Sequence, residues 1–306
     1  MGRFDDQVVV VTGAGGGLGR AHALLLAAEG AQVVVNDYGG DSYGTAGTAE
    51  AAERVVAEIK ANGGHAVADA HDVAIDGAAV VQTALDAFGG LHAVVNNAGI
   101  VGGGEFDAIP EADYDRMLAI HFGGTLAVTR AAWPVLKAQQ YGRVVNTSSA
   151  SVFGLPYSSA YVTAKAAIFG LTRALGQEGR HNGIKVNGIM PSAYSRLTAQ
   201  SPEFGPVMKA GFPAERVSPF VGALASRDVP VTGETFVVGG GRAARVVLGT
   251  VPGVTGLQSI DDALARFEQA MRSDDIVVPD DATAQVLYEC DRIGLDLSSF
   301  GLGTLG

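Results

Sequence analysis

The sequence is poor in cysteine and in positive charge, and each scarcity argues against a class of function. Cys290 is the only cysteine among 306 residues, so no internal disulfide can form, and no Cys/His cluster has zinc-site spacing. Lysine and arginine total 21 against 32 aspartates and glutamates, which gives a formal net charge of −11. A chain with this negative charge is repelled by nucleic acid and by anionic membranes, so we expect neither as a partner. Because no Cys/His cluster has zinc-site spacing, we also expect no metal.

Long hydrophobic runs are also missing. The first residues lack a basic start followed by an apolar stretch, and no segment has the roughly 20 uninterrupted apolar residues of a membrane span. The final Gly-Thr-Leu-Gly is not a peroxisomal address of the Ser-Lys-Leu type. Together with the single cysteine, these features predict a cytoplasmic protein in a reducing compartment.

What the sequence does contain is a regular alternation of two patterns. Short β-branched runs, the first at 8–11, alternate with alanine-rich helical stretches joined by short links. Buried parallel strands connected by helices produce this alternation. We therefore predict an α/β fold with a doubly wound parallel sheet. Strands are expected near 8–11, 32–36, 65–70, 91–95, 142–147 and 234–238. Helices are expected near 20–29, 49–62, 75–88 and 111–139, and a further helix that contains Ala160 should end near 179.

Two further expectations concern helices. The long region 111–139 should break at Trp133, because a proline follows it. Residues 242–306 are low in proline and serine, so they should be a folded extension that packs on the body or on a neighbouring subunit. The extension is expected to be mainly helical, with helices near 260–272 and 282–293.

A glycine-rich turn separates the first expected strand from the first expected helix. It reads Gly13-Ala14-Gly15-Gly16-Gly17-Leu18-Gly19. Glycines make such a turn tight and let a pyrophosphate approach the backbone, and the helix N-terminus offers free N–H groups and a positive dipole end. An ordinary loop is the alternative. The strand before the turn, together with the helix and strand after it, favours a dinucleotide site.

Acidic residues follow the second and third expected strands. Asp37 stands 18 residues after Gly19, where a carboxylate accepts hydrogen bonds from the adenosine ribose and repels a 2′-phosphate. The expected cofactor is therefore NAD rather than NADP, although Arg20 nearby leaves the preference incomplete, and Asp37 as a plain loop or cap residue is the alternative. Asp72 either reaches the adenine edge or caps a turn.

Tyr161 and Lys165 are four residues apart, so a helix places both side chains on one face. A free tyrosine has a pKa of about 10, and a neighbouring ammonium favours the phenolate. Ser148 and Ser149 lie upstream, where a hydroxyl can hold a substrate oxygen before the phenol. The group predicts proton transfer in alcohol and carbonyl chemistry. Alone, such a pair is more often a solvated helix face, and the glycine-rich turn is what favours a site.

Together these motifs resemble the short-chain dehydrogenase/reductases over residues 5–241. The resemblance rests on Thr12-Gly13-x-x-x-Gly17-x-Gly19, Asn96-Asn97-Ala98-Gly99, Ser149 and Tyr161-x-x-x-Lys165. It implies that residues 1–241 form a dinucleotide-binding catalytic domain with a Rossmann-type doubly wound parallel sheet of about seven strands. It also implies hydride transfer between a nicotinamide and a substrate carbon. Within the family, the (3R)-hydroxyacyl-CoA dehydrogenase units of type 2 peroxisomal multifunctional enzymes are the most similar at residues 35–41, 131–133, 147–151 and 195–198.

The resemblance assigns roles to individual residues. Tyr161 transfers the proton, Lys165 lowers the tyrosine pKa and binds the nicotinamide ribose, and Ser149 rather than Ser148 orients the substrate oxygen. Residues 194–213 would form a lid over the substrate, with wall residues among Met190, Leu197, Phe204, Met208 and Phe212. The residues implied in cofactor binding are Gly13, Gly17, Leu18, Gly19, Asp37, Asp72, Val73, Asn97, Ala98, Gly99, Tyr161, Lys165, Pro191 and Ser192.

His121 departs from the family pattern. Most members have an asparagine at this position, which helps a water-mediated proton relay. His121 either substitutes in that relay or only packs, and we favour packing because a lone helix histidine usually packs.

The expected activity is hydride transfer between NAD and a secondary alcohol or ketone, with a 3-hydroxyacyl-CoA as the favoured substrate. A hydroxysteroid dehydrogenase acting on a sterol or on a sterol side-chain CoA ester is the alternative among enzymes. A catalytically silent dinucleotide-binding scaffold is the alternative outside them, and Ser149, Tyr161 and Lys165 argue against it. The family usually pairs subunits through helices near 113–137 and 158–178, which predicts a homodimer or homotetramer.

Overall fold

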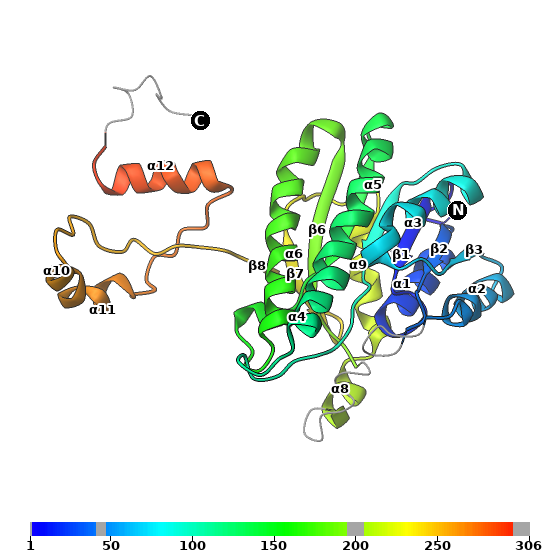
Figure 1. Cartoon of the computed structure of the whole chain (residues 1–306). Helices are drawn as coiled ribbons and strands as arrows, with labels where there is room; N and C mark the ends of the chain where they lie inside the picture. Colours follow the sequence, from blue (N-terminus) through cyan, green and yellow to red (C-terminus); the bar gives the residue numbers. More distant parts are fainter. Residues whose placement is uncertain (1, 41–46, 195–204, 296–306) are drawn as a thin grey trace. The chain divides into compact units, whose positions relative to one another are not determined.

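The structure is a computed structural model that describes residues 2–40, 47–194 and 205–295. Its centre is an eight-stranded sheet with the order β3-β2-β1-β4-β5-β6-β7-β8, and β1 to β7 pair in parallel (Figure 1). The strands are β1 (Val8–Thr12), β2 (Gln32–Asn36), β3 (His65–Asp69), β4 (Ala93–Asn96), β5 (Gly142–Thr147), β6 (Ile184–Ser192), β7 (Thr235–Gly239) and β8 (Arg242–Val246).

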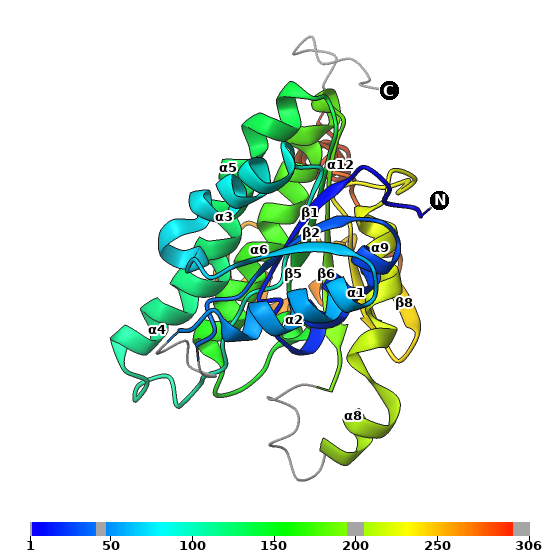
Figure 2. The same cartoon turned by 90° about the vertical axis from the view of Figure 1, so that its right-hand side faces the viewer.

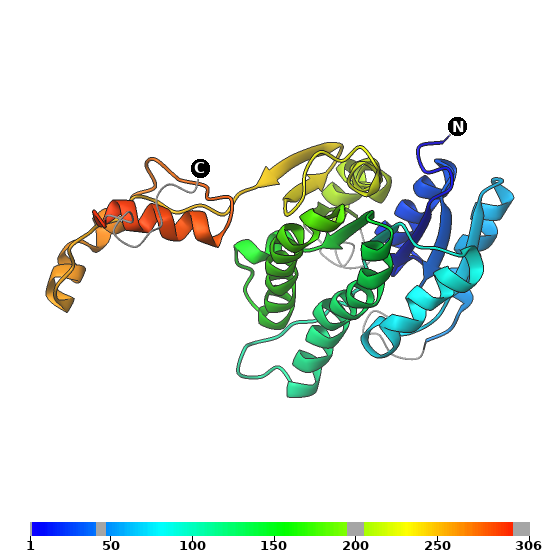
Figure 3. The same ribbon diagram turned by 90° about the horizontal axis from the view of Figure 1, so that it is seen from above.

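Helices cover both faces of this sheet, as Figures 2 and 3 show. They are α1 (Gly17–Ala28), α2 (Glu50–Ala61), α3 (Val73–Phe88), α4 (Glu111–Leu118), α5 (Gly124–Ala138), α6 (Ser159–Glu178) and α9 (Ser218–Ala225), whereas α8 (Gly205–Gly211) projects away from the sheet in Figures 1 and 2. Side chains alternate along a strand, so Val9 and Val11 join the core under α1, α2 and α9, while Val8 and Val10 join the core under α3 and α5. The predicted Rossmann-type doubly wound sheet is confirmed.

The predicted break at Trp133 is wrong. α5 continues through Pro134, and Ala132 and Leu136 on either side of it are fully buried against the sheet. This packing stabilises the helix more than the missing proline N–H destabilises it. The interruption lies upstream, at a π-helical turn, η1 (Ala119–Gly123), between α4 and α5. Such turns often occur at functional positions, and this one carries His121.

An additional strand makes the sheet larger than the seven strands expected. Gly240 and Gly241 have φ values of 59° and 85°, which suits a two-residue hairpin turn that needs positive φ at both positions. The chain therefore turns back after β7 and adds β8. The sheet continues beyond residue 241, where we expected the catalytic domain to end.

The chain divides into two compact units, Met1–Arg245 and Val246–Gly306. The second contains α10 (Ile260–Ala265), α11 (Phe267–Ala270) and α12 (Ala282–Arg292). The helix expected near 260–272 is thus two short helices that meet at Arg266. None of these three helices contains a buried residue, and Ile260, Leu264, Phe267 and Val286 are exposed.

A buried histidine joins two helices of the first unit. His22 of α1 is fully buried, and its Nδ1 lies 2.8 Å from the Ser218 hydroxyl of α9. Burial lowers the pKa of His22 to about 3, because the interior disfavours the imidazolium. The folded protein therefore keeps this histidine neutral at pH values where the unfolded chain protonates it.

We expect stability to fall as the pH is lowered from about 6.5 towards 3. The unfolded state binds the extra proton in this range, so the free energy of unfolding decreases by up to about 1.4 kcal/mol per pH unit for this histidine. The test is urea unfolding at pH 7.5 and 5.0. Between these two pH values, the free energy of unfolding of His22→Gln, whose glutamine cannot titrate, should fall by roughly 2 kcal/mol less than that of the wild type. The exposed control His181→Gln should behave like the wild type, and equal losses in all three proteins would contradict the account.

Candidate active site

The predicted cofactor residues gather where the strands end. β1 and β4 are neighbours, and the strand order reverses between them, which is where doubly wound sheets bind ligands. The glycine-rich turn follows β1, Asp37 follows β2 and Asn97 follows β4. The topology therefore brings three separate sequence motifs to one end of the sheet.

The glycines of the turn have different reasons to be glycine. Gly13 has a φ of 63°, and a Cβ there would lie 2.7 Å from the Ala98 Cα. A Cβ on Gly19 would lie 2.2 Å from the Gly13 carbonyl oxygen. Gly17 also has a positive φ, but no atom lies within 4 Å of its Cβ position. The first and last glycines allow close internal packing, whereas Gly17 leaves open space at the start of α1. Leu18 packs against the core under α1.

Asn97 and Ala98 fix the turn to β4. The Asn97 side-chain amide donates to the carbonyls of Thr12 and Gly13 at 3.0 and 3.1 Å. The backbone N–H groups of Asn97 and Ala98 both donate to the Thr12 hydroxyl at 3.0 Å. These contacts hold the turn in place without using its own N–H groups.

Asp37 lies directly beside the turn. Its carboxylate accepts hydrogen bonds from the backbone N–H groups of Gly15 and Gly39, each at 2.7 Å. Arg20, the basic residue that weakened the cofactor preference, forms a two-pronged ion pair with Glu58, including contacts of 2.7 and 3.0 Å. The charge of Arg20 is therefore balanced by a carboxylate on α2.

Asp72 and Val73 begin α3. Asp72 caps this helix by accepting a hydrogen bond from the Ala74 N–H at 2.9 Å, and the Val73 side chain is buried in the core. Of the two roles expected for Asp72, the structure shows the capping one. Sequence reasoning missed Asp69, a buried carboxylate at the end of β3 that accepts hydrogen bonds from Asn36 and Thr83, both at 2.6 Å. Its position as the last residue of an apolar strand was the available signal.

Two serines of the β5 end have different partners. The Ser148 hydroxyl is buried and donates to the Lys165 carbonyl at 2.8 Å. Ser149 accepts a hydrogen bond from the Ser151 N–H at 3.1 Å and also bonds to the Tyr161 side chain. Ser149 is therefore the serine beside the phenol. Lys165 lies on α6 with Tyr161 and is buried, and its Nζ donates to the Thr147 carbonyl at 2.7 Å.

The electrostatics of the phenol differ from expectation. Burial raises the pKa of Tyr161, and the Ser149 hydrogen bond lowers it by less. The Lys165 Nζ lies 5.7 Å from the centre of the Tyr161 ring, and burial lowers the Lys165 pKa to about 7. With a pKa of about 7, Lys165 is only about half protonated near neutral pH, so it attracts a phenolate weakly. The desolvation that raises the Tyr161 pKa therefore prevails over this attraction. A lowered tyrosine pKa stays a prediction for the protein with its cofactor.

His121 packs against Tyr161. Its ring meets the Tyr161 ring edge to face at 5.2 Å and 87°. Its Nε2 lies 2.9 Å from the Ile100 carbonyl and 3.1 Å from the Ile100 N–H, and burial lowers its pKa. Within the described residues, Nδ1 is buried without a hydrogen-bond partner. A Cβ on Gly99 would lie 2.3 Å from this ring, so His121 accounts for that glycine. Packing is seen, and a role in a relay stays a prediction.

Other expected contacts are only partly described. Pro191 and Ser192 end β6 and pair with Val238 and Gly239 of β7. Met190 is fully buried inside β6, so it packs the core instead of lining a lid. Leu197, Phe204 and the 195–198 segment of the resemblance belong to residues 195–204, which lie outside the described residues. Met208 and Phe212 are half-buried.

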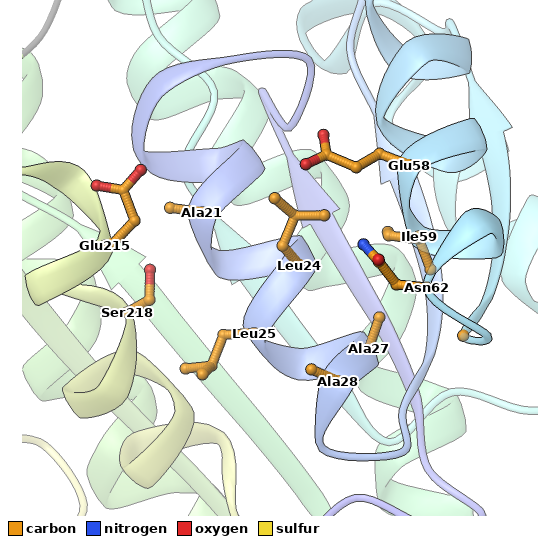
Figure 4. A pocket seen from close by; sticks show the side chains of 11 residues that line it. Ala21, Leu24, Leu25, Ala27, Ala28, Glu58, Ile59, Asn62, Glu215 and Ser218 are labelled. Carbon is orange, nitrogen blue, oxygen red and sulfur yellow. The ribbon is translucent and has the colours of Figure 1, made fainter.

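A separate pocket lies beside α1, as Figure 4 shows. It lies between α1, α2 and the start of α9, and its lining includes Leu24, Leu25, Ile59, Glu215 and Ser218. None of the predicted site residues contributes to it. In the described parts of the chain, no helix is long and apolar enough to cross a membrane, and no group of His, Cys, Asp and Glu could hold a metal ion.

Comparison with known proteins agrees with this geometry. Residues 7–203 match the short chain dehydrogenase family. The chain is 44% identical over 251 residues to a short-chain type dehydrogenase/reductase of Mycobacterium tuberculosis, covering 81% of this chain and 87% of that protein. It is 47% identical over 241 residues to the peroxisomal multifunctional enzyme type 2 of Mus musculus, covering 78% of this chain and 32% of that enzyme.

A solved structure also superimposes well. It is a 7α-hydroxysteroid dehydrogenase in complex with NADH and 7-oxo glycochenodeoxycholic acid, 27% identical, with a TM-score of 0.70 over 78% of this chain and 95% of that one. Against the multifunctional relatives, the chain spans only 26% to 56% of their length.

Proposed function

Since the chain belongs to the short-chain dehydrogenase family, and is therefore a nicotinamide-dependent oxidoreductase, we propose that it oxidises the secondary alcohol of a 3-hydroxyacyl-CoA with NAD. The observation that carries the proposal is the grouping of Ser149, Tyr161 and Lys165 at the carboxyl end of β5. The 3-hydroxyacyl-CoA class is supported by the identity to the mouse multifunctional enzyme.

The choice of NAD rests on charge. Within the described residues, Asp37 forms no ion pair with a basic side chain: its carboxylate accepts from the Gly15 and Gly39 N–H groups, and Arg20 pairs with Glu58. A 2′-phosphate beside an ionised carboxylate is repelled, whereas ribose hydroxyls can donate to it. The NADH in the related hydroxysteroid dehydrogenase is consistent with this choice. Gly17 and the start of α1 would receive the pyrophosphate, with Gly13, Gly19, Asn97 and Ala98 supporting the turn.

The proposed mechanism assigns proton movement to the protein. When bound, NAD supplies the carbon that accepts the hydride. Ser149 holds the substrate hydroxyl, and Tyr161 as phenolate removes its proton. In the reverse direction, protonated Tyr161 returns that proton to the ketone oxygen. Lys165, held by the Thr147 carbonyl, keeps its Nζ near the phenol and would bind the nicotinamide ribose.

The experiment is a turnover assay that follows NADH absorbance. The purified protein is mixed with NAD and with 3-hydroxyacyl-CoAs of both configurations, hydroxysteroids and simple secondary alcohols. We expect the highest kcat/KM with a 3-hydroxyacyl-CoA. A preference for hydroxysteroids would instead favour the second candidate, which the bile acid in the related structure supports. NAD binding with no turnover of any alcohol would favour a silent scaffold.

We further propose that the protein is a homodimer or homotetramer and that the extension packs on the body or on a neighbouring subunit. The exposed apolar side chains of α10 to α12 support this, because a solvated unit rarely leaves so many open. The most exposed, on these helices or at the residue that follows one of them, are Ile260, Leu264, Phe267, Met271, Val286 and Ile293. The expected cytoplasmic location stays a prediction, since the matched mouse relative is named as peroxisomal.

Replacing Leu264 and Phe267 with serine should weaken this packing. We expect Tm to fall by several degrees, because two large apolar side chains lose their burial. Light scattering then distinguishes the two arrangements. A fall in molar mass indicates packing on a neighbour, and a fall in Tm at constant mass indicates packing on the body. Glu268→Ser on the same segment is the control, and unchanged mass and Tm in the double variant would contradict the proposal.

A further inference from the structure

Tyr157 has an unusual backbone conformation. Its φ is 59°, in the left-handed region that glycine adopts without strain and that a tyrosine adopts only with strain. Among the described non-glycine residues, only Asp6, Gln140 and Asp275 share a positive φ. Aspartate tolerates this region better than most residues, and a bulky aromatic residue does not. The sequence therefore keeps a tyrosine where glycine would be more stable.

Neighbouring glycines hold Tyr157 in this conformation. The Gly104 N–H donates to the Tyr157 carbonyl at 2.9 Å. A Cβ on Gly103 would lie 2.4 Å from that carbonyl oxygen, so only glycine allows the two chains to approach so closely. The loop after β4 and the loop after β5 are thus joined at Tyr157. Strain that the surroundings maintain in this way is typical of functional positions.

Tyr157 lies close in sequence to the groups that the proposed function uses. It lies four residues before Tyr161, just ahead of α6, and on the same β5–α6 connection as Ser149. Its side chain is 67% exposed. On the two loops that it joins, Phe106, Phe153 and Leu155 are exposed as well. Four large apolar side chains are therefore exposed on the loops that follow β4 and β5.

We propose that Tyr157 is a specificity-determining residue that binds the apolar part of the substrate, a long acyl chain, at the entrance to the site. This inference rests on the proposed function and deepens it. The aromatic ring would bury its exposed surface against the chain beyond the reacting carbon. The strain is retained because the ring at this position contributes to substrate binding.

Calorimetry with non-reacting acyl-CoAs tests the inference without requiring turnover. The wild type, saturated with NADH, should bind palmitoyl-CoA more tightly than butanoyl-CoA. Tyr157→Gly should reduce that ratio of affinities about tenfold, the size expected for losing one large apolar contact. It should also raise Tm by roughly 2–4 °C, because the strain is relieved. Tyr157→Phe keeps the ring and should keep the ratio.

Gln140→Gly is the matched control. Gln140 is exposed, has a φ of 54° and lies just before β5, at the opposite end of that strand from Ser149. Its replacement should raise Tm in the same way and leave the affinity ratio unchanged. The inference is overturned if the wild type does not prefer palmitoyl-CoA, if Tyr157→Gly leaves the ratio unchanged, or if this variant alters the molar mass, which would make Tyr157 a subunit contact. Failure of alcohol oxidation alone would overturn only the proposed function.

Discussion

Replacing Tyr161 with phenylalanine is expected to lower kcat for alcohol oxidation by roughly 10²–10⁴-fold, the range found for a general acid or base. The substitution removes only the hydroxyl that bonds to Ser149. The ring remains, so its edge-to-face contact with His121 at 5.2 Å should keep the site folded. NADH formation measures the loss, and NADH fluorescence measures whether the cofactor still binds.

The control for this variant is Tyr114→Phe. Tyr114 of α4 also directs its hydroxyl towards α6, where it lies 3.2 Å from the Thr163 hydroxyl. Its loss should leave kcat nearly unchanged. The wild-type oxidation rate should also rise with pH, because burial raises the phenol pKa and the phenolate is the base. An unreduced kcat in Tyr161→Phe, with the cofactor bound, would remove the basis of the proposed mechanism.

A second large effect is expected from Asp37→Asn, which should lower the preference for NAD over NADP by about 100-fold. Repulsion between one carboxylate charge and a nearby 2′-phosphate contributes a few kcal/mol at the effective dielectric of a protein surface. Asparagine keeps a side-chain oxygen that can accept from the Gly15 or Gly39 N–H, so the turn should remain folded. The measurement is kcat/KM with each cofactor at a fixed substrate concentration.

Two companion variants sharpen this test. Glu58→Gln removes the carboxylate that pairs with Arg20, so the released guanidinium should improve NADP use further when combined with Asp37→Asn. Glu50→Gln, at the start of the same helix, removes a carboxylate without freeing Arg20 and is the control. If the ratio of NAD to NADP use stays constant in Asp37→Asn, the carboxylate does not select the cofactor.

Much of the fold followed from local patterns. β2 and β5 lie at the predicted residues, because buried β-branched runs bounded by glycine or polar residues permit few alternatives. β6 was not assigned, because Asn187, Gly188 and a proline interrupt its apolar pattern. Packing decided the rest: α5 continues through Pro134 because its neighbours are buried, and η1 has no composition signal.

The site was predictable to a similar extent. Spacing along a helix placed Tyr161 and Lys165 together, and strand ends placed Asp37 and Asn97 at one end of the sheet. Desolvation was not predictable, since the burial that raises the Tyr161 pKa and lowers the Lys165 pKa depends on the assembled tertiary structure. The same holds for the strain at Tyr157, which depends on a loop more than 50 residues away.

The hairpin at Gly240 and Gly241 limits how copies of this chain can associate. β8 covers the open side of β7, so another molecule that approached there would meet a strand of five residues that carries Arg242 and Arg245. A short outermost strand that carries an exposed charge such as Arg242 resists pairing with its own copy, whereas the charge of Arg245 is balanced by Glu234. We therefore expect copies of this chain to meet through helices instead of joining their sheets into one.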